Sequence, residues 1–258
     1  MIGALDQLAA FGQTWLAVAF AVFLRVGAAM ALFPAFGERS VPERVRLVLA
    51  LAFTLVVAPA AEPQVSVALA AGTRPVAFLF TETLAGFAIG AVIRLFVHVL
   101  QIAGAMAAQS TSLAQLFGGQ NSDPQPAMGH VLLVGGLALA VMFGLHIRLA
   151  EVLILSYDIF PPGALPGAGL LSSWGLARVA EAFALAFTLA APFVVAALVY
   201  NVALGVINRA MPQLMVAFVG APAITAGGLI LLVLTAPLAL DLWTEALMRF
   251  LANPFGGY

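Results

Sequence analysis

The chain has 258 residues, of which 64% are hydrophobic and 8% are charged, and its formal net charge is −1. Soluble domains carry about 25% charged residues, so this composition excludes an ordinary soluble domain and predicts a membrane protein. The near-neutral charge excludes a nucleic-acid-binding surface, which needs clustered basic residues. The absence of cysteine excludes disulfides and thiolate metal sites.

The apolar residues form about six long segments, which predict an all-α membrane protein. The first segment covers about residues 11–33 and ends before Pro34. The second covers residues 47–58 and is expected to stop at Pro59, so that residues 60–75 form a loop. The third covers about residues 76–108, which is too long for one simple membrane crossing at about 1.5 Å per residue. Its Gly86 and Gly90 form a GxxxG motif, which we interpret as a site of close helix packing.

A polar interval, residues 109–126, separates the third segment from the fourth. Its non-helical backbone groups would be unpaired in hydrocarbon, so the interval must lie in water or against a protein-lined passage. Gln109 begins it, and an apolar group stands in its middle beside two glycines that permit bending. The residues of that middle part are Leu113, Leu116, Phe117, Gly118 and Gly119.

The last three segments are also long or interrupted. The fourth covers residues 127–155, the fifth about residues 176–207 with Pro192 inside, and the sixth residues 214–247. Pro222 and Pro237 are expected to break the sixth segment. Broken or over-long helices rich in Gly and Pro are tolerated where neighbouring helices pair the freed backbone groups. This pattern favours a chain packed among other subunits.

Charged residues inside the apolar segments are candidates for function, subunit interfaces or buried ion pairs. Arg148 with Glu151, and Arg178 with Glu181, stand three residues apart and can pair along one helix. Glu82 and Arg94 are too far apart on one helix to meet, so each needs a partner elsewhere. The residues that we assign to subunit interfaces or buried ion pairs are Arg25, Glu82, Arg94, Arg148, Glu151, Arg178, Glu181 and Arg209.

No pattern of residues predicts an enzyme, a metal site or a cofactor. The chain has no glycine-rich phosphate loop followed by Lys and no GxSxG motif, and its three histidines are scattered. A small-molecule secondary transporter is the main alternative to an assembly subunit, because Pro192, Pro222 and Pro237 fit discontinuous helices. That alternative predicts inverted repeats, and none is evident.

Four stretches together resemble the FliR family of flagellar and type III secretion export-gate proteins. The first runs from Arg25 through AFGERSVPERVR to Pro59, and the second from Glu82 through Gly86 and Gly90 to Gln109. The third is the polar interval with Asp123 and Pro124. The fourth, residues 190–222, contains the pattern NxxLGxxNRxxPQ. Their order and spacing cover nearly the whole chain.

The resemblance implies helical hairpins within a helical export gate, at the bacterial inner membrane and flagellar basal body. FliP-like and FliQ-like subunits are the implied partners in the gate, FlhB-like and FlhA-like components are further partners, and unfolded flagellar proteins are the cargo. By the same resemblance, residues 1–171 are a FliP-like part and residues 172–258 a FliQ-like helical hairpin. The polar interval matches a loop that plugs the closed gate. An equivalent subunit of an injection-type type III secretion system is the alternative within the family.

Overall fold

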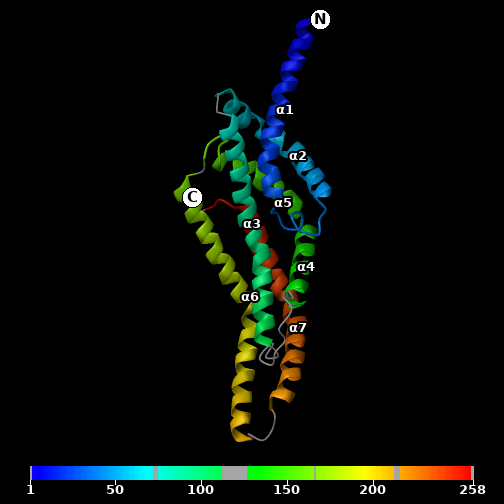
Figure 1. The fold of residues 1–258 in the computed structure, drawn as a ribbon, viewed down its shortest axis with the longest axis vertical. Helices are drawn as coiled ribbons and strands as arrows, with labels where there is room; N and C mark the ends of the chain where they lie inside the picture. Colours follow the sequence, from blue (N-terminus) through cyan, green and yellow to red (C-terminus); the bar gives the residue numbers. More distant parts are fainter. Residues whose placement is uncertain (1, 72–74, 112–126, 166, 212–215, 257–258) are drawn as a thin grey trace. The chain divides into compact units, whose positions relative to one another are not determined.

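The computed structural model of the protein describes residues 2–71, 75–111, 127–165, 167–211 and 216–256 (Figure 1). These residues form helices and connecting turns, without a strand. The described helices are α1 (Ile2–Met30), α2 (Glu43–Ala70), α3 (Pro75–Thr111), α4 (Ala127–Met142), α5 (Leu145–Ile159), α6 (Ala168–Ala210) and α7 (Val216–Ala252). Five of them are long and apolar enough to cross a membrane, or six if α4 and α5 together make one bent span. The prediction of an all-α membrane protein is confirmed.

Helix α2 does not stop at Pro59, as the sequence pattern predicted, but continues through Pro59 and Pro63 to Ala70. The predicted loop of residues 60–75 is therefore wrong over most of its length. Each proline removes one N–H donor from the helical ladder. A helix interior tolerates this loss where packed neighbours hold the chain, and Val57, Ala58 and Ala61 around the first proline are buried.

The fourth predicted segment is two helices, because the chain breaks between Met142 and Leu145. Gly144 has φ +83°, in the left-handed region that glycine adopts at little cost. Its N–H donates to the carbonyl of Val141 at 3.1 Å, and its own carbonyl accepts from the N–H of Ile147 at 2.9 Å. These two bonds lie at the end of α4 and the start of α5.

Helix α6 begins at Ala168, eight residues before the predicted start, and continues through Pro192. Helix α7 continues through the positions of Pro222 and Pro237, where the sequence pattern predicted breaks. The predicted proline breaks were wrong for the same reason in α2 and α7. Proline usually ends a helix that is surrounded by water. A long apolar helix continues through proline, because its backbone N–H and C=O groups would have no other hydrogen-bond partners in an apolar environment.

The chain divides into two compact units, each assembled from separate stretches of sequence. The first unit contains residues 1–95, 141–178 and 248–258, and thus α1, α2, the first part of α3, and α5. Apolar side chains of α1 form part of the core of this unit, and Val22, Val26 and Met30 of α1 are fully buried. Leu149 and Leu153 of α5 are buried equally completely in the same unit.

The second unit contains residues 96–140 and 179–247, so it holds the end of α3 and most of α4, α6 and α7. Trp243 of α7 is fully buried, and its indole N–H donates to the carbonyl of Phe96 at 2.8 Å. Gly104 of α3 lies so close to Gly129 of α4 that a side chain at Gly104 would collide with the backbone of Gly129. Glycine at that crossing allows the two helices to pack backbone against backbone.

Candidate functional site

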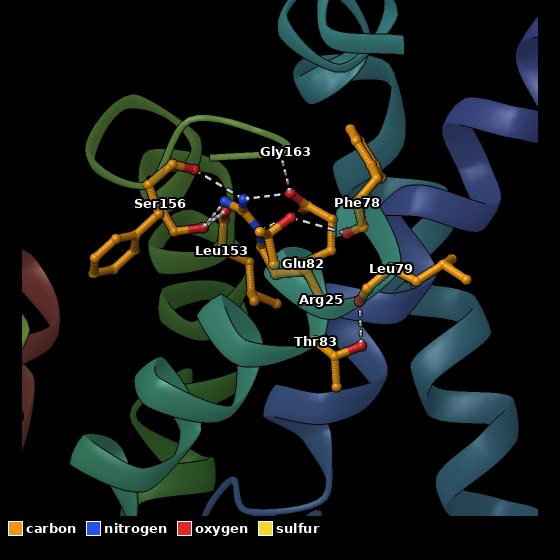
Figure 2. Close-up of polar contacts among 10 residues, drawn as sticks. Arg25, Phe78, Leu79, Glu82, Thr83, Leu153, Ser156 and Gly163 are labelled. Carbon is orange, nitrogen blue, oxygen red and sulfur yellow. Dashed lines mark hydrogen bonds and ion pairs between the residues drawn. The ribbon is translucent and has the colours of Figure 1, made fainter. Parts of the chain in front are cut away.

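A buried ion pair joins α1 to α3 inside the first unit (Figure 2). Arg25 of α1 is 1% exposed and Glu82 of α3 is 0% exposed. The Nε of Arg25 donates to Oε2 of Glu82 at 2.9 Å, and its Nη2 donates to Oε1 at 3.1 Å. This is the two-pronged geometry in which a planar guanidinium matches a carboxylate best.

Helix α5 and the loop after it supply the remaining partners of the ion pair. Nη1 of Arg25 donates to Oγ of Ser156 at 3.1 Å, and Nη2 donates to the carbonyl of Phe160 at 2.8 Å. The N–H of Gly163 donates to Oε1 of Glu82 at 3.2 Å. Figure 2 shows Ser156 and Gly163 directed at the two charged side chains. The hydrogen bonds of this cluster therefore connect α1, α3, α5 and the loop that follows α5.

The aromatic ring of Tyr157 covers one face of the guanidinium, with its centre 3.7 Å from Cζ of Arg25. Such a stacked cation is further stabilised in a site without water. Each guanidinium nitrogen of Arg25 has an acceptor, so the charge is held at a fixed place. We therefore interpret the cluster as a set of structural contacts that hold the helices together, and not as a proton relay.

Gly86 allows the ion pair to form, because it lets α3 approach α1 closely. A side chain at Gly86 would collide with the backbone carbonyl of Arg25. One turn later, a Cβ at Gly90 would lie 2.9 Å from the carbonyl oxygen of Ala29. The interpretation of the GxxxG motif as a packing site is confirmed.

A second ion pair holds the loop between α1 and α2 against α3. Nη1 of Arg94 lies 2.6 Å from Oε1 of Glu38, and Nη2 lies 3.2 Å from Oε2. The two side chains are 20% and 16% exposed. Arg46 of α2 adds a bond from Nη2 to the backbone carbonyl of Glu38 at 3.0 Å. Glu38 is thus bound through its side chain and through its backbone.

The remaining charged candidates lie nearer to the surface of the chain. Nη1 of Arg148 lies 2.9 Å from Oε2 of Glu151, and both side chains are 47% exposed. Arg209 is exposed in the last turn of α6. Their exposure leaves them accessible to a partner or to a membrane surface.

Arg178 and Glu181 both lie on α6. Cζ of Arg178 lies 6.0 Å from the centre of the Phe250 ring, and Arg178 is partly buried. Glu181 is exposed. Arg178 therefore has an aromatic neighbour from the end of α7, which the spacing in sequence did not predict.

Among the candidate plug residues, the structure places only Gln109, which is exposed in the last turn of α3. Leu113, Leu116, Phe117, Gly118 and Gly119 lie outside the described residues. Their role as a plug stays a prediction.

Several partners of the two ion pairs were not among the sequence candidates. In the second ion pair, Glu38 is the partner of Arg94. In the buried cluster, Ser156, Tyr157 and Phe160 at the end of α5 surround Arg25. Ser156 carries the one signal available in sequence, since it is a polar residue within an apolar helix. A backbone carbonyl such as that of Phe160 gives no signal in the sequence.

An aromatic cluster extends the buried site to the C-terminal end of the chain. The ring centre of Phe160 lies 6.4 Å from that of Trp174 and 5.8 Å from that of Phe255. The indole N–H of Trp174 donates to the carbonyl of Pro254 at 3.1 Å. Phe160 thus contacts Arg25 through its carbonyl and the C-terminal residues through its ring.

A cavity of about 240 Å³ in the second unit has an almost wholly apolar lining. Its polar neighbours Thr111 and Tyr200 donate to backbone carbonyls of Ala107 and Gly220, at 3.1 and 2.6 Å.

Within the part of the chain that the structure describes, no group of three or more His, Asp or Glu side chains could hold a metal ion.

Comparison of the sequence with known proteins assigns the chain to a family. Residues 16–250 match the family described as bacterial export proteins, family 1. The chain is 33% identical over 230 residues to the flagellar biosynthetic protein FliR of Caulobacter vibrioides, covering 88% of this chain and 92% of that protein. It is 29% identical to FliR of Escherichia coli, covering 87% and 86% of the two chains, and 28% identical to FliR of Bacillus subtilis, covering 82% and 83%. The chain therefore belongs to the bacterial export proteins, family 1.

Proposed function

We propose that this chain is a membrane subunit of the flagellar type III protein export gate. The observation that carries the proposal is the family match over residues 16–250, together with the name FliR of the relatives. Five or six helices capable of crossing a membrane are compatible with a place in the bacterial inner membrane, at the flagellar basal body. The role is to form part of a passage for unfolded flagellar proteins and not to catalyse a reaction.

The surface of the second unit carries large apolar side chains that lipid or other subunits must cover. Large apolar side chains on α6 are widely exposed, including Leu198 and Val199, each 64% exposed. Val233 and Leu234 of α7 are 74% and 71% exposed. Such surfaces need either lipid or protein to cover them. We propose FliP-like and FliQ-like subunits as the main covering partners, with FlhB-like and FlhA-like components as further contacts.

The proposed division of the chain is a FliP-like part, residues 1–171, and a FliQ-like hairpin, residues 172–258. In the first part, the buried cluster of Arg25 and Glu82 holds three helices in one arrangement. A fixed arrangement is what a subunit needs when it must present the same faces to several neighbours. The long helices α6 and α7 would form the hairpin.

The polar interval, residues 109–126, is proposed as the plug of the closed gate. Leu113, Leu116 and Phe117 would supply an apolar seal, and Gly118 and Gly119 would permit movement. Gln109, exposed at the end of α3, would stand at its base. A plug must contact water when the gate is open and exclude it when the gate is closed, and this mixture of residues suits both states.

A secretion assay in cells that lack the chromosomal gene tests the function. We expect these cells to release no flagellar proteins into the medium and to regain release when the full chain is supplied. Cells that instead release flagellar proteins normally without the gene would contradict the export role.

A chain with residues 113–119 deleted tests the plug, and we expect it to let ions leak across the membrane. An ion-tight membrane with unchanged secretion would show that the interval is not a plug, while leaving the export role intact.

A further inference from the structure

The first unit has a groove of about 420 Å³ at the α1–α2 contact, separate from the buried ion-pair cluster. Its wall is apolar along most of its length and becomes charged at the end formed by the start of α2. The apolar wall contains Phe23, Leu24, Gly27, Leu47 and Ala50, and the charged end contains Glu43 and Arg46. A groove of this kind suits a ligand with an apolar part and a charged part.

Within the described residues, some N–H groups of the Arg46 guanidinium have hydrogen-bond partners and one buried N–H group has none. Its Nη2 donates to the backbone carbonyls of Glu38 and Val41, at 3.0 and 3.4 Å. Its Nε is buried, and it has no hydrogen-bond partner within the described part of the chain. A buried N–H without an acceptor is costly, so Arg46 has hydrogen-bonding capacity that its partners among the described residues do not fill.

The charge around this end of the groove is positive. Arg39 and Arg44 are exposed and lie in the turn before Arg46 and in the first turn of α2, respectively, and Glu43 is the one carboxylate at the lining. The other nearby carboxylate, Glu38, is neutralised by Arg94. The surface therefore attracts an anion, and arginine binds phosphate oxygens particularly well.

The position of the groove points to a membrane lipid. The candidate membrane span in α1 ends at Met30, and the candidate span in α2 begins at Glu43. The turn with Arg39 thus connects two candidate spans, and lipid headgroups are expected at the level where such spans end. Basic pockets between membrane helices bind anionic lipid headgroups, and an apolar wall below such a pocket accepts acyl chain.

We propose that this groove binds one anionic phospholipid. Its phosphate accepts hydrogen bonds from Arg46 and is attracted by Arg39 and Arg44. The first carbons of one acyl chain lie along the wall at Phe23, Gly27 and Leu47. This proposal is independent of the export-gate function, because it requires only that α1 and α2 end at a membrane surface.

Binding is measured by native mass spectrometry of the full chain in a neutral detergent, with dioctanoyl phosphatidylglycerol and dioctanoyl phosphatidylcholine as probes. We expect tighter binding of phosphatidylglycerol, with a preference that falls at high salt because exposed charges are screened. We expect Arg46→Gln and Arg44→Gln each to weaken that binding about fivefold, the effect of roughly 1 kcal/mol per basic residue near an anionic lipid. Arg44→Gln is informative because it leaves both backbone bonds of Arg46 in place.

Gly27→Leu tests the apolar wall without removing a charge. A Cβ at Gly27 would meet only the ring of Phe23, at 3.9 Å, an ordinary contact, and Gly27 lines the groove, so a larger side chain there is expected to occupy groove volume. Gly12→Leu is the matched control, since it makes the same change in α1 where nothing lies within 4 Å. We expect Gly27→Leu to abolish phosphatidylglycerol binding and Gly12→Leu to leave it unchanged.

Three results would overturn the proposal. The first is equal binding of the two lipids, and the second is a Gly27→Leu chain that binds phosphatidylglycerol as tightly as the unaltered chain. The third is the loss of lipid binding when the chain is extracted together with its neighbouring membrane proteins. That result would mean that a protein partner covers the groove in the assembly.

Discussion

Replacement of Glu82 by Gln is expected to lower the free energy of unfolding by about 3–5 kcal/mol, because it leaves the Arg25 charge buried without a counter-charge. Arg25 is 1% exposed, so water cannot solvate it in place of the lost carboxylate. A loss of this size is a large share of the total stability of a typical protein. Thermal unfolding of the purified protein, followed by tryptophan fluorescence, measures the effect, since Trp174 lies beside Phe160 in the same cluster.

Glu151→Gln is the matched control for this experiment. It makes the same chemical change in an ion pair whose partners are 47% exposed, where the expected loss is below about 1 kcal/mol. Arg25→Lys distinguishes geometry from charge, because lysine keeps the charge but cannot make the paired bonds of Nε and Nη2. We expect an intermediate loss for that variant. Equal melting temperatures for Glu82→Gln and Glu151→Gln would mean that the buried cluster does not stabilise the fold.

Gly86→Ala is expected to destabilise the first unit by about 1–3 kcal/mol, as overpacking of a well-packed interior does. The added methyl group would collide with the backbone of Arg25, so α1 and α3 must separate. Gly86 lies one turn after Glu82 on the same face of α3. Separation of the helices therefore also stretches the ion pair. Thermal unfolding again measures the loss, and the amount of intact protein in membranes provides a second measure.

Gly175→Ala in α6 is the control for the glycine experiment. No atom lies within 4 Å of the position that its new Cβ would take. Because alanine favours a helix over glycine by about 1 kcal/mol, we expect this variant to be as stable as the unaltered chain or slightly more stable. If Gly86→Ala behaved in the same way, close approach of α1 and α3 at this position would be wrong.

The helical membrane fold was predictable because it depends on composition and segment length alone. The ends of the helices were less predictable, and proline explains most of the errors. Pro59 and Pro237 lie inside continuous helices, although the rule for water-exposed helices predicted interruptions there. The break at Gly144 was missed because the local sequence is apolar on both sides, and only its backbone conformation reveals the turn.

Three charged residues of the candidate site were predictable, but their contacts were not. Arg25, Glu82 and Arg94 stood out because charges in apolar helices are costly. Their partners lie far away in sequence: Glu82 is 57 residues from Arg25, and Glu38 is 56 residues from Arg94. Such pairs follow from how helices pack, which spacing along one helix cannot predict. The plug and the division at residue 171 stay predictions.

The proposed function requires that the chain works inside an assembly of membrane proteins. The direct test is to tag the chain, extract it from membranes in a mild detergent, and measure the mass of the intact particle and the identity of its components. We expect a particle well above the 26.6 kDa of the single chain, containing FliP-like and FliQ-like polypeptides. A stable particle that contains only this 26.6 kDa chain would contradict the account.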